Sequence, residues 1–135
     1  MKIRHYQNGD REALIALWQT VFPDDPPHNA PTEVIDAKLA VDDLIFVAET
    51  GTGIVGACMA GYDGHRGWLY ALAVLEAYRG QGIGANLVEH SLKALKAQGC
   101  LKVNLQVRAS NQKVERFYRA LGFEVEARIS MGRFI

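Results

Sequence analysis

Residues 69–87 read LYALAVLEAYRGQGIGANL, and this stretch decides the fold. The apolar run Leu69–Leu75 predicts a buried strand, and a helical pattern follows the glycines. Between the two, alternating Gly80, Gly82 and Gly84 leave the backbone without Cβ atoms at a turn into a helix. The first N–H groups of a helix are unpaired and lie at the positive end of its dipole. The stretch therefore predicts either a phosphate-binding turn or a tight strand-to-helix turn without a ligand.

The spacing of these glycines argues against the two familiar nucleotide-binding loops. A P-loop ends in Gly-Lys-Ser/Thr, and no Lys follows the glycines here. A dinucleotide fingerprint needs a third small residue, and that position is Leu87, or Ala85 if the count starts at Gly80. The acidic residue that should follow about 20 positions later is absent from residues 100–107. An unrelated phosphate-binding or nucleotide-binding α/β domain remains an alternative.

Hydrophobic periodicity over the rest of the chain predicts strands and helices in alternation. The predicted strands are residues 2–7, Leu44–Glu49, Ile54–Tyr62, Trp68–Leu75, Leu101–Val107, Phe123–Ala127 and Ile129–Arg133. The predicted helices are one capped by Asp10, one capped by Thr32, one over Gln81–Gln98 stopped by Gly99, and one from Asn111 to Gly122. Asp63-Gly64 predicts a tight hairpin turn. Hairpins combined with strand–helix units imply an α/β domain with a mixed sheet.

Length and composition are typical of a small cytoplasmic enzyme. The 135 residues predict a single domain over 1–135. Fifteen basic and fifteen acidic side chains cancel, so no large field favours nucleic acid or a membrane. The N-terminus lacks the apolar segment of a signal peptide, and no apolar run is long enough to span a bilayer. Cys58 and Cys100 predict buried reduced thiols, and no cysteine or histidine cluster suggests a metal site.

The pattern Arg79-x-x-Gly82-x-Gly84 after an apolar strand resembles the acetyl-CoA signature of the GNAT superfamily of N-acetyltransferases. Downstream, residues 104–111 (NLQVRASN) and 117–123 (FYRALGF) resemble the second half of that family. Residues 44–128 fit the family pattern, and residues 1–43 fit its first strand and two helices. The segment 61–67 (GYDGHRG) resembles the small bacterial subgroup called YpeA.

This resemblance implies a fold and a cofactor. The fold is a mixed central sheet, flanked by about four helices, in which the strands ending at Val74 and starting near Leu101 splay apart. Acetyl-CoA would lie in the opening as a co-substrate, with its pantetheine arm along the first of these strands. Residues implied in binding acetyl-CoA are Leu72, Ala73, Val74, Arg79, Gly80, Gln81, Gly82, Ile83, Gly84, Ala85 and Asn111. The side chains of Leu72–Val74 can belong to the core at the same time, Arg79 can be a surface charge, and Asn111 can be only an N-cap.

The resemblance also implies how the reaction is catalysed. The hydroxyl of Tyr118 would protonate the leaving CoA thiolate, although Tyr118 can also simply pack against the sheet. Gln106 stands where some relatives have a glutamate that deprotonates the incoming amine, and an amide cannot act as a base. Glu49, Asp63, His65 or an ordered water are the alternatives for that role.

The acceptor pocket is the least specified part of the chain. Trp68 and Tyr70 share one face of the central strand, and either line the pocket or pack under a helix. Asp63 and His65 either contribute to the site or belong only to a solvated hairpin. The sequence thus predicts an N-acetyltransferase (EC 2.3.1.-) acting on a primary amine of a small molecule or peptide, and it leaves a homodimer open. A non-catalytic acyl-CoA-binding sensor is the alternative, with Gln106 in its favour.

Overall fold

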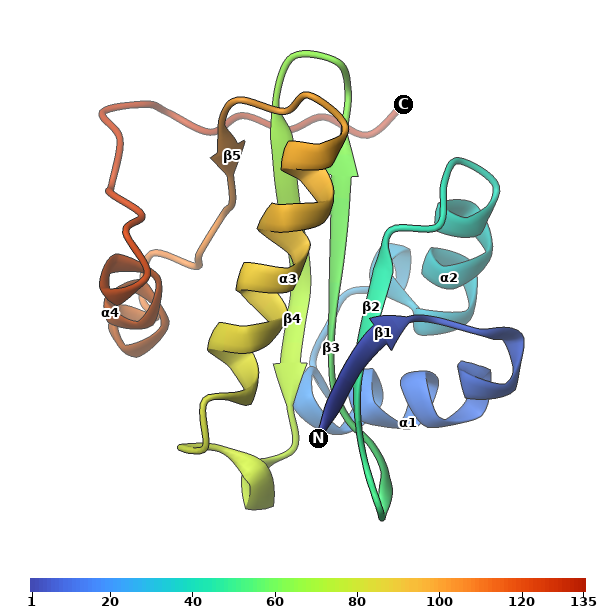
Figure 1. Ribbon diagram of the computed structural model, residues 1–135. Helices are drawn as coiled ribbons and strands as arrows, with labels where there is room; N and C mark the ends of the chain where they lie inside the picture. Colours follow the sequence, from blue (N-terminus) through green and yellow to red (C-terminus); the bar gives the residue numbers. More distant parts are fainter. The chain divides into compact units, whose positions relative to one another are not determined.

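Five strands form one mixed sheet in the computed structural model, which describes residues 1–135 (Figure 1). The strands are β1 (Lys2–His5), β2 (Ile45–Thr50), β3 (Gly53–Tyr62), β4 (Gly67–Val74) and β5 (Val103–Asn104). They lie in the order β1-β2-β3-β4-β5, antiparallel from β1 to β4, and β5 runs parallel to β4. The α/β fold with a mixed sheet is confirmed.

Four α-helices accompany the sheet, as the sequence predicts. They are α1 (Arg11–Val21), α2 (Pro31–Leu39), α3 (Ile83–Ala97) and α4 (Gln112–Ala120). Three short 3-10 helices are η1 (Asn8–Asp10), η2 (Pro27–Asn29) and η3 (Glu76–Tyr78). Gly99 and Gly122 follow α3 and α4 with φ of +92° and +95°, which is the left-handed conformation that ends a helix. None of the helices combines the length and the apolar character that crossing a membrane would require.

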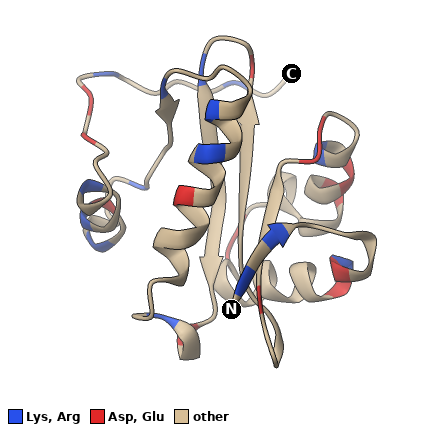
Figure 2. Cartoon of the chain, in the orientation of Figure 1, with Lys and Arg blue, Asp and Glu red and all other residues tan.

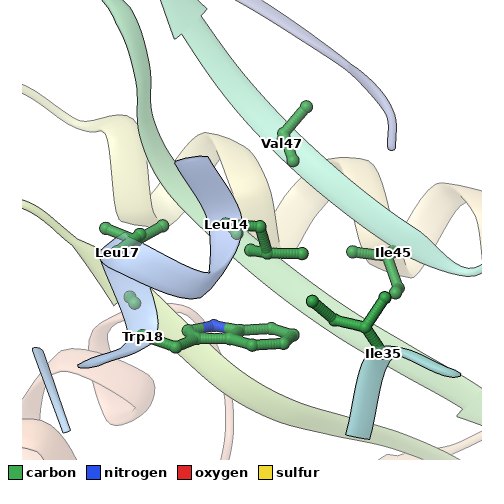
Figure 3. Packing of buried hydrophobic residues seen from close by; sticks show 8 residues of the cluster. Leu14, Leu17, Trp18, Ile35, Ile45 and Val47 are labelled. Carbon is green, nitrogen blue, oxygen red and sulfur yellow. The ribbon is translucent and has the colours of Figure 1, made fainter. Parts of the chain in front are cut away.

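One face of the sheet is covered by α1 and α2. Their apolar stripes place Leu14, Leu17, Trp18 and Ile35 against alternate residues of the strands, and all four side chains are buried (Figure 3). The strand residues in this cluster are Ile45, Val47, Ala57 and Ala73. Because residues two apart on a strand share a face, the same alternation turns Phe46 and Cys58 to the opposite side.

The opposite face is covered by α3, which crosses in front of β3 and β4 in Figure 1. The ring of Phe46 makes an edge contact with His90 of α3, with ring centroids 4.8 Å apart. Gly56 has no side chain because a Cβ there would lie 3.1 Å from a methyl carbon of Leu87. The lack of a side chain at Gly56 therefore allows α3 to pack closely against the sheet.

The chain forms two compact units, Met1–Leu105 and Gln106–Ile135, and each is described here by itself. The first contains the sheet and α1–α3, and the second contains α4 and the segment after it. In the second unit Tyr118 is buried, with its ring 5.0 Å from that of Phe117 and 5.6 Å from that of Phe123. The prediction of a single domain over 1–135 stays a prediction.

Three predicted strands are corrected by the structure. The strand expected over Leu101–Val107 is only β5, and Leu101 is almost fully exposed. Residues Phe123–Ala127 and Ile129–Arg133 form no strand, and residues 124–135 are exposed. Alternation of apolar residues indicates that a segment can pair, but a strand also needs a neighbouring backbone that stays within hydrogen-bonding distance.

Two predicted helix caps are also corrected. Thr32 lies inside α2, which begins at Pro31, and its hydroxyl bonds the Glu33 carboxylate instead of the backbone. Proline is favoured at a first helical position, since it has no N–H to leave unpaired. Asp10 does precede α1, but its carboxylate accepts hydrogen bonds from Arg4 at 2.7 and 2.9 Å and makes no cap bond to the helix. A charge-assisted bidentate pair outcompetes a single cap bond.

Candidate active site

The edge of β4 beyond its first residues has no neighbouring strand. β5 pairs with β4 only at Gly67↔Val103 and Trp68↔Asn104. From Leu69 to Val74 this side of β4, termed here the unpaired edge, lacks a strand partner. The predicted splaying of the two strands is therefore present in the structure.

At the end of the unpaired edge, the carbonyl of Val74 points away from the neighbouring strand β3. The N–H of Leu75 donates to the carbonyl of Val55 on β3 at 2.9 Å. The two polar groups of a trans peptide point in opposite directions, so the Val74 carbonyl in the same peptide faces away from β3. There it accepts a 2.9 Å hydrogen bond from Nε of Arg79. The Arg79 side chain is thus tied to the end of β4, which the sequence left open.

A β-bulge interrupts β4 in the middle of the unpaired edge. Ala73 pairs with Ala57, and Tyr70 pairs with Met59, so Ala71 and Leu72 together oppose the single residue Cys58. Ala71 has a φ of +50° and is the only residue other than glycine with a positive φ. Its carbonyl accepts a 3.0 Å hydrogen bond from the indole nitrogen of Trp18. No local pattern in the sequence indicates this bulge.

The bulge changes which side chains share a face of the sheet. Directly opposed residues of two strands point to the same side, so Tyr70 follows Met59 to the side of α1 and α2, where Ala73 also lies. Without the extra residue, Tyr70 and Ala73 would lie on opposite faces. The structure therefore brings Tyr70, which is 44% exposed, onto the face that α1 and α2 cover.

The glycine-rich turn presents unpaired backbone N–H groups, as the sequence predicts. Gly80 and Gly82 have φ of +78° and +82°, and nothing lies within 4 Å of where their Cβ atoms would be. The first helical hydrogen bond of α3 runs from Asn86 N–H to the Gly82 carbonyl, so the N–H groups of Ile83, Gly84 and Ala85 precede it.

The charges around this turn favour an anion. Arg79 is the only charged residue between Glu76 and Glu89 (Figure 2). Gln81 and Gly82 are exposed, which leaves the outer side of the turn accessible. Gly80 and Gly82 present no Cβ to an approaching phosphate, so the N–H groups at the start of α3 could hold a pyrophosphate such as that of CoA.

The hairpin between β3 and β4 gathers the predicted acceptor residues. Asp63 Oδ1 accepts 2.7 Å hydrogen bonds from the N–H groups of Arg66 and His65. These bonds, with a smaller contribution from the Trp68 side chain, hold the pKa of the Asp63 carboxyl below its usual range. Burial, and secondarily the charge of Asp63, raise the pKa of Tyr70. Asp63 thus stabilises the hairpin turn, and it lies close to Trp68 and Tyr70. Its contribution to the acceptor site stays a prediction.

The other two side chains considered as a base differ in their surroundings. His65 is exposed, and its backbone N–H is held by Asp63. Glu49 of β2 forms an ion pair with Arg4, with a nitrogen–oxygen distance of 3.1 Å. No group of three His, Cys, Asp or Glu side chains is placed to hold a metal ion.

Three predicted site residues belong to the second unit. Asn111 caps α4, since its side-chain oxygen accepts a 3.3 Å hydrogen bond from the N–H of Val114. Tyr118 lies two turns further along the same helix. Gln106 is exposed and lies beyond β5, so its expected place on a strand is wrong, and its amide donates a hydrogen bond to the Ser130 hydroxyl. The roles of Asn111 and Tyr118 toward a cofactor stay predictions.

Comparison with known proteins agrees with this arrangement. Residues 11–123 match the model of the Acetyltransferase (GNAT) family. Acetyltransferase SG1711 of Sodalis glossinidius is 43% identical over 127 residues, which cover 93% of this chain and 89% of that protein. A solved structure from Agrobacterium tumefaciens strain C58 is 27% identical with a TM-score of 0.80, covering 99% of this chain and 100% of that one.

A third similarity concerns the fold alone. The aminoglycoside N-acetyltransferase AAC(6')-Iy, in complex with the bisubstrate analogue CoA-S-monomethyl-acetylneamine, has a TM-score of 0.82 at 21% identity. The match covers 99% of this chain and 97% of that one. The finer likeness of residues 61–67 to the YpeA subgroup stays a prediction. Family model, relatives and fold agree, and the chain belongs to the GNAT family of acetyltransferases.

Proposed function

We propose that this protein transfers the acetyl group of acetyl-CoA directly to a primary amine of a small molecule or peptide. The observation that supports this most is the continuity of the unpaired edge of β4 with the glycine-rich turn. Acetyl-CoA, in which an extended pantetheine arm is joined to a pyrophosphate, matches both features at once. Residues 1–135 then act as one acetyltransferase domain.

Acetyl-CoA would be held mainly by backbone groups. The unpaired edge at Leu72–Val74 offers a strand-like partner to the amide-containing pantetheine arm. The N–H groups from Gly80 to Ala85 would bind the pyrophosphate, because Gly80 and Gly82 have positive φ and open space at their Cβ positions. Asn111 is proposed to add a contact from the start of α4.

The chemistry needs no covalent enzyme intermediate. The amine nitrogen attacks the thioester carbon, a C–N bond forms, and the C–S bond breaks. Backbone N–H groups of Leu72–Val74 would stabilise the negative charge on the carbonyl oxygen, as in an oxyanion hole. The Tyr118 hydroxyl would give its proton to the departing thiolate, and the amine proton leaves to solvent or a base. Alignment of amine and thioester would supply much of the remaining acceleration.

A small-molecule acceptor is supported by the hairpin. Tyr70, Trp68 and Asp63 lie close together near the start of β4, and Tyr70 is partly exposed. An aromatic surface beside a carboxylate suits a ligand that bears a cationic amine. The likeness to AAC(6')-Iy, whose bound analogue joins CoA to an aminoglycoside fragment, agrees with an acceptor of this class.

Thiol release with an amine library, followed by mass spectrometry of the products, tests the proposal. The protein's own thiols give little background, since Cys58 is fully buried and burial raises its pKa to about 11, while Cys100 is 7% exposed. We expect amine-dependent release of CoA. The product should be heavier than the amine by about 42 mass units, because an acetyl group replaces one hydrogen. Titration with ATP and NAD in place of acetyl-CoA tests the unrelated nucleotide-binding alternative.

A second candidate is a non-catalytic acyl-CoA sensor. It is favoured by Gln106, an amide at the place where some relatives have a base. The same library separates the two candidates, because a sensor binds acetyl-CoA tightly and releases no thiol with any amine.

A further inference from the structure

Trp18 connects the core under α1 to the bulge of β4. Its ring lies within the apolar cluster of α1 and α2, and it is only 4% exposed (Figure 3). Its indole nitrogen nevertheless reaches 53 residues along the chain to donate a 3.0 Å hydrogen bond to the carbonyl of Ala71. The indole therefore both packs in the core and bonds the backbone of β4, whereas a phenylalanine could only pack.

The acceptor of this hydrogen bond is held in an unusual conformation. Ala71 adopts a φ of +50°, which residues with a Cβ rarely adopt without support from their surroundings. Support at this point comes from the bond to Trp18, which fixes the orientation of the peptide between Ala71 and Leu72.

That orientation determines where one N–H group points. The peptide is trans, so its N–H, which belongs to Leu72, points away from its carbonyl. Trp18 holds the carbonyl toward α1, and the N–H of Leu72 therefore faces away from α1. Leu72 lies on the stretch of β4 that has no partner in β5.

We propose that Trp18 is a positioning residue for acetyl transfer: by holding the carbonyl of Ala71, it aims the N–H of Leu72 at the carbonyl oxygen of the thioester. This inference rests on the proposed function, in which acetyl-CoA lies along the unpaired edge. It adds a residue from α1, outside the acetyl-CoA signature, to the machinery that recognises the acetyl group. It also makes the preference for acetyl-CoA over CoA depend on a core tryptophan.

Trp18→Phe tests this, because it removes the N–H donor and keeps an aromatic ring in the core. A misdirected N–H should lower kcat by about tenfold to a hundredfold, as small misplacements of catalytic groups do. Affinity for acetyl-CoA should fall several-fold while affinity for CoA, which lacks the thioester carbonyl, stays the same. Leu14→Ala is the matched control, since it weakens the same cluster and leaves both partners of the Trp18–Ala71 hydrogen bond unchanged, so the ratio of the two affinities should not change.

Rescue by a second substitution separates positioning from packing. Glycine adopts a φ of +50° without strain, so Trp18→Phe/Ala71→Gly should regain part of the lost kcat and of the preference for acetyl-CoA. Unchanged kcat and unchanged affinity ratio in a folded Trp18→Phe variant would refute the inference, whatever happens to its melting temperature. Wild-type protein that releases no thiol with any amine would instead overturn the proposed function itself.

A measurement on the wild type covers the case in which Trp18→Phe does not fold. The amide proton of Leu72 should move downfield in the NMR spectrum with acetyl-CoA and not with CoA, and the indole proton of Trp18 should be protected from exchange with solvent. Equal Leu72 shifts with the two ligands, or rapid exchange of the indole proton, would contradict the inference.

Discussion

Nε of Arg79 donates a 2.9 Å hydrogen bond to the carbonyl of Val74, so the first residue of the glycine-rich turn is tied to the last residue of β4. The strand edge and the turn are thereby held in one arrangement. A ligand that occupies both would find its two binding surfaces already in register. An amide of such a ligand that donates to the Val74 carbonyl would have to share this acceptor with the Arg79 side chain or displace that side chain.

Gly82→Glu should abolish the binding of acetyl-CoA. The substitution adds bulk and negative charge at the proposed pyrophosphate site, where nothing now lies within 4 Å of a Cβ position. For the wild type, acetyl-CoA at one hundred times its Kd should raise the free energy of unfolding by about 2.7 kcal/mol. Thermal unfolding of the wild type and of Gly82→Glu, with and without acetyl-CoA, measures the stability gain and its loss in the variant.

Two controls separate charge from backbone strain at this position. Gly82→Ala strains the left-handed backbone, at a cost of about 1–2 kcal/mol, without adding charge. Gly51→Glu adds the same charge at a turn with open space and no positive φ, and should leave binding intact. Retained affinity in a folded Gly82→Glu variant would exclude this turn as the pyrophosphate site.

Tyr118→Phe should lower kcat by roughly 10²–10⁴ and leave the KM for acetyl-CoA nearly unchanged. Only the hydroxyl is lost, and the edge contacts of the ring with Phe117 and Phe123 remain. Steady-state kinetics of thiol release, with Tyr6→Phe as the control, measures the effect. Full kcat in the variant would mean that Tyr118 is only a core residue and that the thiolate takes its proton from water.

The rate should rise with pH toward the pKa of the acceptor amine, because Gln106 is an amide and cannot deprotonate that amine. That pKa is about 7.7–8.0 for an α-amine and about 10.4 for a lysine-like amine. Asp63→Asn should leave this rise of the rate with pH (the limb of the profile) in place, since the pKa of Asp63 is lowered and its carboxylate is already ionised at neutral pH. His65→Ala should also leave it in place, whereas Gln106→Glu should flatten it by supplying a base.

The pH profile of kcat/KM for these three variants and for Gln106→Ala decides between the candidate bases. A rise of rate with pH that disappears in His65→Ala would identify His65 as the base. A loss of rate in Gln106→Ala with an unchanged limb would make Gln106 a positioning residue, acting through its hydrogen bond to Ser130.

Asp10→Asn should destabilise the protein by about 1.5–3 kcal/mol at pH 7, the usual range for a charge-assisted hydrogen bond. The Arg4 side chain, followed by the backbone N–H of Gln7, lowers the pKa of Asp10 in the folded state. Folding therefore gains this contribution above the ordinary aspartate pKa of about 3.9 and loses it as pH falls through the lower, folded value.

Urea unfolding at neutral and acidic pH measures that contribution. The difference in the free energy of unfolding between wild type and Asp10→Asn should shrink as the pH falls below about 4, which is near the ordinary aspartate pKa. Asp43→Asn is the control, since the Asp43 side chain is 83% exposed. An Asp10→Asn difference that is the same at pH 7 and in acid would contradict the assignment to this ion pair.

Gly67→Ala should destabilise the first unit by about 1–3 kcal/mol, as overpacking of a core does. A Cβ at Gly67 would lie 2.7 Å from the sulfur of Cys100 and 3.0 Å from a methyl carbon of Val103. Adding Cys100→Ala should recover part of the loss, and Gly132→Ala, in open space, should have no effect. Equal stability of Gly67→Ala and the wild type in chemical denaturation would show that β5 and the end of α3 can yield at this point.

The elements with strong local signals were predictable. Glycines with positive φ at Gly80 and Gly82 follow from their spacing before a helix, and the alternation of the strands indicated β2, β3 and β4 to within a residue or two. The cap at Asn111 and the helix end at Gly122 were also readable, because each depends on the conformation of only a few neighbouring residues.

The sequence by itself determined the family, the glycine-rich turn and the strand that leads into it, because backbone freedom and side-chain alternation are local properties. The tertiary structure alone decided the bulge at Ala71, its hydrogen bond to Trp18, and the shortening of β5 to two residues. An alanine takes a left-handed conformation only when distant groups hold it there. A strand ends where its neighbour diverges, whatever its own apolar pattern continues to favour.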